Sequence, residues 1–357
     1  MSKLDTSSYK GVRDFYPEEQ FIQNYIFHTW REAVESFGYS EMNASILEPS
    51  ELYKEKSGEE IVNEQTFTFT DRGGRDVTLR PEMTPTIARM VASRKRELGF
   101  PLRWYSIQNF FRYEAPQRGR LREHWQLNAD IFGVDDIEAD IEVITLASQI
   151  FYRFGAKEND FEIRINYSGS DAEKLGIIVG QLEIRGIKNI KIDPELARGQ
   201  AYYTGVIFEI FDTNPENSRS LLGGGRYDEL MELFGTEKIP AVGFGSGDVT
   251  LQDFLITHGL LPEYNNTARI ALLPLNNTNF EAVEKIAREL RKKKLNIFVD
   301  WTARKVGDML RHADKNRILY TVVIGDDEIA SNKYKLKNLK TGEEREVTLD
   351  EIPECVK

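Results

Sequence analysis

The sequence predicts an α+β fold, in which an antiparallel sheet flanked by helices is followed by a small α/β domain. Three observations support this. Residues 40–133 contain short alternating apolar segments separated by turn signals, as antiparallel strands require. Amphipathic helical patterns precede and follow these segments. Beyond residue 268, strand-like and helix-like segments alternate, which is typical of an α/β domain.

The helices are expected where apolar residues recur at spacings of three and four, over residues 18–37, 84–96 and 138–154. "TFTFTD" and "DVTLRPE" share the turn "DRGGRD", which predicts a hairpin. The stretch "FRYEAPQRGRLREHWQLNADIFG", residues 111–133, predicts a strand, a basic loop and a second strand. "AVGFGSGDVTLQDFL" predicts a strand that leads into a helix.

The clearest domain boundary lies in "HGLLPEYNNTA", a connector of low hydrophobicity at residues 258–268. It predicts two domains, over residues 1–261 and 268–357. In the second domain the order strand, helix, strand, helix, strand predicts a parallel or mixed sheet. Within the first domain, residues 167–191 begin with the linker-like "YSGSD" and are expected to be a linker or a shortened segment.

Composition limits the function classes. The net charge is −11, so any nucleic-acid contact must come from local patches. One cysteine, Cys355, and four scattered histidines indicate neither disulfides nor a metal cluster, and the metal site is left unknown. No segment approaches the ~20 apolar residues of a membrane span. A cytoplasmic protein without membrane contact is therefore expected.

The basic loop suggests a binding site for phosphates. Arginine's rigid set of donors suits phosphates and carboxylates, and four arginines surround this loop; a solvated hairpin tip is the alternative. The strand that follows carries Gln126 and Asp130, which are four residues apart and should face the same side. Polar groups on one face of an apolar strand suggest ligand contact. The four arginines are Arg112, Arg118, Arg120 and Arg122.

Three further segments carry candidate binding residues. Glu82 and Thr84 follow a strand and could meet a ligand amine, although Thr84 before a proline could instead cap a helix. Arg198, Tyr202 and Tyr203 precede a strand and could contact a charged or ring-shaped ligand, although aromatic residues there are usually core. Two glycine runs, at residues 223–225 and 243–247, allow close backbone approach but are weak signals alone.

Taken together, these segments resemble the class II aminoacyl-tRNA synthetases, and specifically the histidyl-tRNA synthetase family. The basic stretch at 111–133 resembles the second class-defining motif. "LRPEMTPTIAR" resembles the amino-acid-binding segment, and "RGQAYYTGVIFEI" the histidine-specific segment. The resemblance covers nearly the whole chain. It implies a class II catalytic core followed by an anticodon-binding-like domain.

The resemblance also implies an activity and roles for single residues. The activity is ATP-dependent formation of histidyl-adenylate with Mg²⁺, followed by transfer to tRNA(His), in a homodimer. The implied catalytic residues are Arg198 and Arg112; ATP would be bound by Arg112, Glu114, Arg120, Arg122 and His124; histidine would be bound by Glu82, Thr84, Gln126, Asp130, Tyr202 and Tyr203.

Several departures from the family pattern fall near the implied site. Ala115 and Thr250 stand where the family has arginines, Gln200 and Ala201 replace Leu-Asp, and Ser45 replaces a proline. The family's helical insertion that grips the tRNA acceptor stem is expected to be shortened here to residues 167–191, either as a natural compact form or, as the Ser-Gly-Ser tract favours, through engineering.

These departures leave two functions open. The first is a compact histidine-tRNA ligase. The second is a synthetase-like paralogue or redesigned variant, with altered or lost ligase activity, that acts as a small-molecule binding or regulatory protein. The C-terminal domain disfavours a biosynthetic regulator, which generally lacks it. In that domain "RELRKKK", Lys305 and Arg311 predict a local tRNA-binding patch, with a solvated helix end as the alternative.

Overall fold

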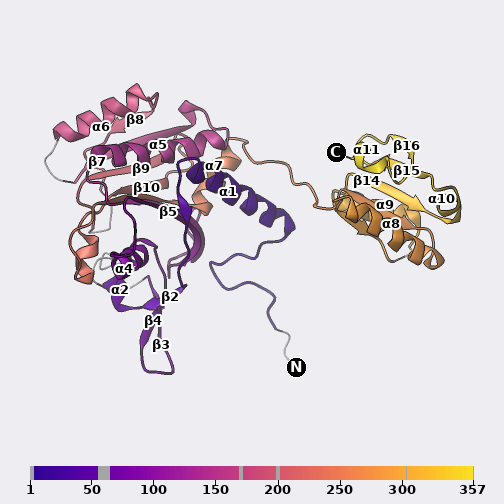
Figure 1. Cartoon of the computed structure of the whole chain (residues 1–357), viewed down its shortest axis with the longest axis horizontal. Helices are drawn as coiled ribbons and strands as arrows, with labels where there is room; N and C mark the ends of the chain where they lie inside the picture. Colours follow the sequence, from indigo (N-terminus) through magenta and orange to yellow (C-terminus); the bar gives the residue numbers. More distant parts are fainter. Residues whose placement is uncertain (1–3, 55–64, 169–171, 198–201, 303, 357) are drawn as a thin grey trace. The chain divides into compact units, whose positions relative to one another are not determined.

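The computed structural model describes residues 4–54, 65–168, 172–197, 202–302 and 304–356. The chain divides into two compact units, Met1–Pro262 and Glu263–Lys357 (Figure 1). Each unit has its own hydrophobic core. They are described separately below.

The first unit is built on an eight-stranded sheet with the order β1-β5-β6-β11-β10-β9-β7-β8. The pairs β1–β5 and β7–β8 are parallel, and the other neighbours are antiparallel. The predicted α+β class is thus confirmed. The strands are β1 (Ser40–Glu41), β5 (Leu102–Phe111), β6 (Glu123–Phe132), β7 (Phe161–Tyr167), β8 (Ile190–Ile192), β9 (Val206–Asp212), β10 (Ser220–Arg226) and β11 (Ala241–Gly247).

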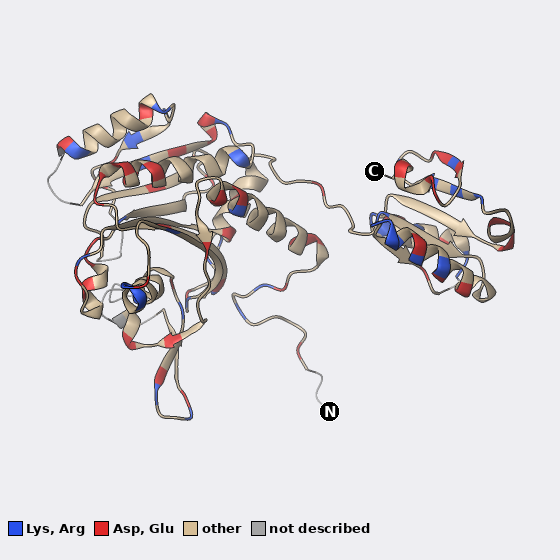
Figure 2. Ribbon diagram, in the orientation of Figure 1, with Lys and Arg blue, Asp and Glu red and all other residues tan. Residues whose placement is uncertain are grey.

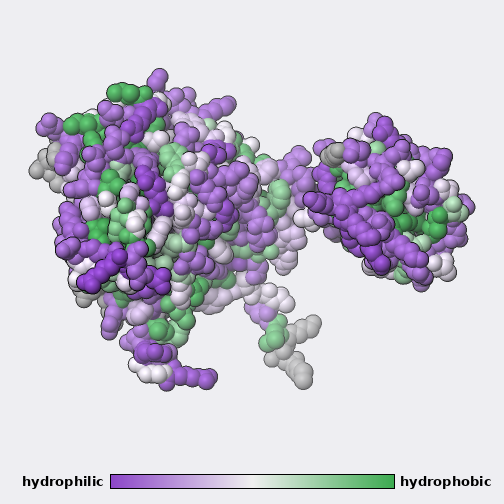
Figure 3. All heavy atoms as spheres, viewed as in Figure 1, coloured by the Kyte–Doolittle hydropathy of each residue, from purple (hydrophilic) through white to green (hydrophobic). Residues whose placement is uncertain are grey.

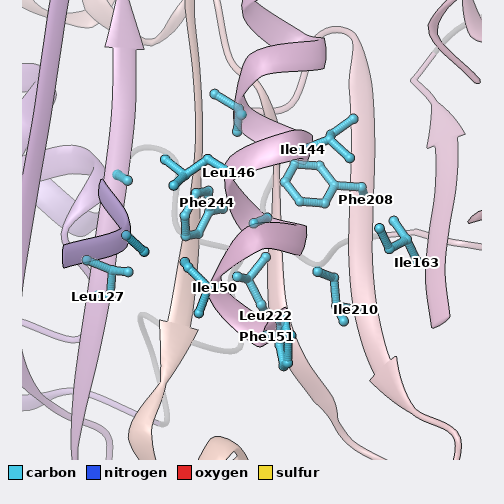
Figure 4. Close-up of a cluster of buried hydrophobic side chains, with 14 of the residues drawn as sticks. Leu127, Ile144, Leu146, Ile150, Phe151, Ile163, Phe208, Ile210, Leu222 and Phe244 are labelled. Carbon is cyan, nitrogen blue, oxygen red and sulfur yellow. The ribbon is translucent and has the colours of Figure 1, made fainter. Parts of the chain in front are cut away.

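Helices cover one face of this sheet and create the main core. α5 places Ile144, Ile150 and Phe151 against Phe208 of β9 and Phe244 of β11, and all five side chains are buried (Figure 4). The Asp136 carboxylate caps this helix by accepting from the Glu138 backbone N–H at 3.0 Å. Successive strand residues alternate in direction, so the sheet has a second face. A separate buried cluster, which includes Ile87 of α4 and Phe110 and Phe132 of the sheet, lies outside the main core. The helices are α1 (Pro17–Glu35), α2 (Glu51–Lys54), α4 (Thr84–Arg94), α5 (Ile137–Arg153), α6 (Ala172–Ile184) and α7 (Asp248–Thr257), with 3₁₀ turns at Glu158–Asp160 and Leu230–Phe234.

Two predicted hairpins are present. β3 (Phe67–Thr70) and β4 (Asp76–Leu79) pair in antiparallel fashion around the predicted turn, and β2 (Leu47–Pro49) joins them in a three-stranded sheet. β5 and β6 pair over ten residues each, from Leu102 opposite Phe132 to Phe111 opposite Glu123. The basic loop therefore lies between two paired strands, as predicted.

The expectation of a linker within residues 167–191 is wrong for most of that segment. Residues 172–184 form helix α6, and β8 extends the sheet in parallel to β7. α6 contributes Leu175, Ile178 and Leu182 to the main core, so this segment is part of the fold. The sequence expectation failed because it gave weight to the polar start of the segment and too little to these spaced apolar residues. The rest of the Ser-Gly-Ser tract, residues 169–170, and Asp171 lie outside the described residues.

The second unit is a five-stranded mixed sheet with the order β13-β12-β14-β15-β16. β13, β12 and β14 are parallel, and β15 and β16 are antiparallel additions, as the alternating strand and helix pattern predicted. Clusters of buried residues lie on both faces. The elements are β12 (Ile270–Pro274), a 3₁₀ turn (Asn277–Asn279), α8 (Phe280–Lys292), β13 (Ile297–Val299), α9 (Val306–Lys315), β14 (Tyr320–Ile324), α10 (Asp326–Ser331), β15 (Tyr334–Asn338), β16 (Glu344–Val347) and α11 (Ile352–Cys355).

Surface charge in the second unit is mixed. Basic and acidic residues alternate along α8, visible as blue and red in Figure 2. In the predicted basic patch, Lys292 pairs with Glu289 at 2.7 Å and Lys293 with Asp350 at 2.5 Å. Acidic partners therefore neutralise part of this patch. Figure 3 shows one face of the molecule, on which apolar residues lie in separate patches among hydrophilic ones. None of the helices described here is long and apolar enough to cross a membrane.

Candidate functional site

A cavity of about 510 Å³ opens on the sheet of the first unit. This is within the usual range of small-molecule sites, ~300–1,000 Å³. The cavity collects predicted residues from three separate sequence segments. Those that line it are Glu82, Thr84, Arg112, Glu114, Arg120, His124, Gln126, Asp130, Tyr202 and Tyr203.

β6 supplies one side of the cavity. His124, Gln126 and Asp130 alternate along the strand and line the cavity, as their even spacing predicted. Asn128 lies between them and also lines it; the same alternation indicated this residue, and the sequence analysis missed it. Leu127 of β6 belongs to the main apolar core on the opposite face (Figure 4), as do Ala129 and Ile131. β6 therefore separates the apolar core from a polar site.

Glycines of β11 provide the space for these polar side chains. A Cβ atom on Gly243 would lie 2.0 Å from Asp130 Oδ1, and one on Gly245 would lie 1.9 Å from Gln126 Nε2. Real Cβ atoms do not approach other atoms so closely. The close packing of β6 side chains on the backbone of β11 thus explains the second glycine run, residues 243–247. Side chains of β6 extend over a strip of bare backbone.

Asp130 is the most perturbed acid in the cavity. It is 3% exposed and accepts a hydrogen bond of 2.5 Å from the Tyr227 hydroxyl. Burial raises the pKa of its carboxyl to about 7, although the Tyr227 hydrogen bond opposes that shift. A carboxyl group that titrates near neutrality on a cavity wall is a candidate for contact with a ligand cation. Tyr227, two residues after the glycine run at 223–225, was not predicted as a site residue.

A group of tyrosines holds Glu82 in place. The Tyr202 hydroxyl donates to Glu82 Oε2 at 3.0 Å, and both residues are buried. The Tyr202 ring contacts those of Tyr203 and Tyr227, with centroids 4.9 and 5.9 Å away. Thr84 begins α4, and the capping position before it is Met83. The alternative interpretation of Thr84 as the helix cap is therefore wrong.

The basic loop brings two arginines to the cavity. Arg112 Nε donates to the Pro81 carbonyl at 3.0 Å, which orients its guanidinium. Arg120 pairs with the buried carboxylate of Glu114 at 2.5 Å. Both arginines remain on the cavity wall, where they could meet an anionic ligand.

Arg122 does not line this cavity, contrary to the expectation that it binds phosphates. Its Nη1 donates to the Tyr9 hydroxyl at 2.9 Å, and its Nε donates to the Glu114 carbonyl at 3.1 Å. Its guanidinium also lies 4.0 Å from the Tyr113 ring centroid. Arg122 is buried and attaches the N-terminal segment to the loop. Ala115, the proposed position of a missing donor, is exposed and is not among the residues that line the cavity.

His124 is held in its neutral form. Burial lowers the pKa of its imidazole to about 3, and the positive charges of Arg112 and Arg13 act in the same direction. Its ring lies 5.9 Å from that of Phe110 on the neighbouring strand. A neutral imidazole can stack on a nucleotide base, and it does not repel the two nearby arginines as a charged imidazole would.

Other predicted residues fall outside the described part of the chain. These are Arg198, Gln200 and Ala201. The structure also brings in a cationic residue that was not predicted: Arg219 lines the cavity from the connection between β9 and β10. Nothing local in the sequence indicated its position.

Comparison with known proteins adds to this geometry. The family model described as histidyl-tRNA synthetase matches residues 11–169 and 164–249. The chain belongs to the histidyl-tRNA synthetase family. A second model, described as anticodon binding domain, matches residues 269–357. The expected resemblance and fold class are therefore confirmed.

Individual members of the histidyl-tRNA synthetase family match over nearly the full chain. The histidine–tRNA ligase of Leptospira biflexa is 38% identical over 410 aligned positions, which cover 94% of each chain. That of Thermoplasma volcanium is 34% identical over 415 positions and 96% of each chain. Among solved structures, apo Staphylococcus aureus histidyl-tRNA synthetase superposes with a TM-score of 0.86 at 27% identity and covers both chains completely.

The comparisons also bear on the predicted shortened insertion. The alignment to the Leptospira protein, at 410 positions, is longer than this chain of 357 residues, so the relative has positions without a counterpart here. The two matches of the family model meet at residues 164–169, at the end of β7. Both observations support the predicted position of a shortened insertion, which stays a prediction.

Proposed function

We propose that the protein activates histidine with ATP and transfers it to tRNA(His). The observation that carries this proposal is the cavity of about 510 Å³ in the first unit, where buried acids and tyrosines at one end adjoin arginines and a neutral histidine at the other. An amino acid and a nucleoside triphosphate need those two kinds of surroundings. Membership of the histidyl-tRNA synthetase family supports this reaction.

The amino-acid end is formed by residues around Asp130. Glu82, oriented by Tyr202, and Thr84 would bind the α-amino group of histidine. Asp130, Gln126 and Tyr203 would surround the amine, carboxylate and imidazole, where buried polar groups reject a side chain that leaves them unpaired. These roles follow the family pattern and the shared cavity.

The nucleotide end is formed by the basic loop and the start of β6. Arg112 would contact the α-phosphate and the histidine carboxylate together, and Arg120 would meet the outer phosphates beside Glu114. His124 would stack on adenine. Arg122 is not included in this proposal, because it is not among the residues that line the cavity and its Nε and Nη1 donate to the Glu114 carbonyl and the Tyr9 hydroxyl.

The chemistry is an in-line displacement. A carboxylate oxygen of histidine attacks the α-phosphorus, a carboxylate oxygen to phosphorus bond forms, and the bond from that phosphorus to the bridging oxygen of pyrophosphate breaks. Arg112 would balance charge as it builds on the α-phosphate. On the family pattern Arg198, which lies outside the described residues, would have the same role. Mg²⁺ would enter with ATP as its phosphate-bound counterion; the described residues hold no cluster of three or more metal-ligating side chains.

The second unit is proposed to bind the anticodon region of the tRNA. Support comes from the match to the anticodon binding domain and from basic residues of α8 and α9, although several have acidic partners. A homodimer and a cytoplasmic location are proposed on the family pattern alone.

The second candidate is a synthetase-like binding protein with altered or lost ligase activity. The replacements Ala115 and Thr250 and the short insertion favour it. The match of residues 269–357 to an anticodon binding domain favours the ligase, because a small-molecule regulator has no use for that unit.

Two assays in sequence separate these functions. Histidine-dependent exchange of pyrophosphate into ATP tests the adenylate step, and charging of tRNA(His) tests transfer. The ligase proposal predicts both. Exchange without charging would place the defect in tRNA docking; absence of exchange from folded protein would leave the binding function.

A further inference from the structure

We propose that Arg219 is a nucleotide-binding residue that supplies the positive charge missing at Thr250. The inference rests on the proposed function and identifies a residue that the family motifs do not indicate. It starts from the position of Arg219, which lines both the main cavity and an adjoining cavity of about 370 Å³.

Strand register places Arg219 at the nucleotide end of the site. β10 and β11 pair with Leu222 opposite Ser246, so the residue before β10 lies beside the start of α7, which carries Thr250. β11 in turn pairs with β6, with Gly247 opposite Gln126. At ~3.3 Å per residue along β6, this end is over ten ångströms from Asp130 and the amino-acid end.

The Arg219 side chain lies between the basic loop and α7. A Cβ on Gly119, at the tip of the basic loop, would be 2.8 Å from Arg219 Cδ and 3.3 Å from Thr250 Cγ2. Gly119 also has a positive φ of 72°, so glycine suits this position for two reasons, the backbone conformation and the lack of space for a Cβ atom. Arg219 and Thr250 are therefore neighbours across one glycine. Arg219, from the connection between β9 and β10, therefore lies next to Thr250, the position at which the family has an arginine.

The guanidinium of Arg219 is available to a ligand. No hydrogen bond or ion pair joins its side chain to any part of the chain that the structure describes. It is only partly buried. Nearby Arg118 differs, because it donates to Asn217 Oδ1 at 2.9 Å and lies near two acids. An arginine without an acidic partner on a cavity wall suits a polyphosphate or a base.

The segment that carries Arg219 is fixed in place. The buried Asn217 side chain donates to Asp212 Oδ2 at 2.6 Å and to Thr257 Oγ1 at 3.0 Å. On the other side of Arg219, Ser220 Oγ donates to the Leu222 carbonyl at 2.9 Å. Anchors on both sides reduce the entropy lost when the guanidinium binds a ligand.

The test compares R219A with wild type in pyrophosphate exchange and in direct calorimetric binding of ATP. Loss of one charge-assisted contact predicts a KM for ATP about 10- to 100-fold higher, with the KM for histidine unchanged. R219K should recover part of the loss. The matched control is R185Q, since Arg185 pairs with Glu138 on α5, outside the residues that line the cavity, and it should behave as wild type.

The rescue variant R219A/T250R tests directly whether Arg219 supplies the positive charge that is missing at position 250. An arginine restored at position 250 should return the KM for ATP to within about threefold of wild type. A KM for ATP that stays within about twofold of wild type in R219A, or an equal rise in both KM values, would overturn the inference. If wild type shows no exchange, the ligase proposal fails, while calorimetric loss of ATP binding in R219A alone would still support the role of Arg219.

Discussion

The carboxylate of Asp130 accepts a hydrogen bond of 2.5 Å from the Tyr227 hydroxyl, and both groups are buried beside the cavity. This pair holds an ionisable acid where water cannot fully stabilise its charge. The cavity therefore contains an acid that changes charge near neutral pH, and a ligand cation can stabilise its ionised form. This relationship leads to the first prediction.

Asp130→Asn should change the pH dependence of stability. The folded-state pKa is raised from 3.8 to about 7, so the folded state binds a proton more tightly than the unfolded state. Stability is therefore lost as pH rises from about 4 to about 7. The variant lacks this loss and should be more stable than wild type at pH 8, by about 1–4 kcal/mol, but not at pH 4. Urea unfolding of both proteins across this range measures it; parallel pH curves would contradict the raised pKa.

The same acid should affect substrate affinity. The ionised form of Asp130 attracts the cationic amine of histidine, so the KM for histidine should fall as pH rises through about 7. In the Asn variant that fall should disappear and the KM should be higher at pH 8. Pyrophosphate exchange at saturating ATP measures both. A KM with the same pH profile in the two proteins would remove Asp130 from the amine contact.

The glycine strip of β11 should not tolerate side chains. In Gly243→Ala the new Cβ would lie 2.0 Å from Asp130 Oδ1 and 2.7 Å from the backbone oxygen of Ala129, which cannot move aside easily. We expect a loss of about 1–3 kcal/mol in stability and a raised KM for histidine. The control is Gly176→Ala in α6, where the new Cβ would meet no heavy atom within 4 Å beyond its chain neighbours and the nearby backbone of its own helix, so a neutral or stabilising effect is expected. Equal effects of the two variants would argue against the crowding at Gly243.

Tyr202→Phe should weaken histidine binding without unfolding the protein. It removes the hydroxyl that donates to Glu82 at 3.0 Å and keeps the ring contacts with Tyr203 and Tyr227. A net hydrogen-bond contribution of about 1 kcal/mol predicts a rise in the KM for histidine of about threefold to tenfold, with an unchanged KM for ATP. Tyr16→Phe, at an exposed tyrosine, is the control. If the KM for ATP rose and the KM for histidine did not, Glu82 would not belong to the amino-acid end of the site.

Arg112 and Arg122 should differ although both belong to the basic stretch. Arg112→Gln removes a donor from the cavity wall, and we expect kcat for exchange to fall by about 10²–10³ with stability preserved. Arg122→Gln breaks buried contacts with Tyr9 and Glu114, so it should lower stability by about 1–3 kcal/mol and leave the KM for ATP nearly unchanged. Denaturation and exchange kinetics on both variants separate the roles. A reversed result would return Arg122 to the phosphate site.

Local patterns in the sequence predicted the parts of the site that depend on one strand. Alternation along β6 correctly placed Gln126 and Asp130 on the cavity side, and it would also have placed Asn128 there. The turn between β3 and β4 followed from its glycines. These features depend on neighbours in the chain, which the sequence shows directly.

Features that depend on distant segments were missed. Arg122 points to Tyr9, 113 residues away, and no loop pattern could distinguish it from Arg120. Arg219 reaches the cavity because β10 pairs with β11 beside α7. Tyr227 is a site residue because it meets Asp130 across 97 positions. In each case tertiary packing selects the partner.

Histidine-dependent exchange of pyrophosphate into ATP by the wild-type chain tests the central claim most directly. It requires that the acids and tyrosines around Asp130 and the arginines of the basic loop act together on histidine and ATP in one cavity. We expect exchange that requires histidine and is absent with other amino acids. Folded protein that binds ATP and histidine yet shows no exchange would contradict the account.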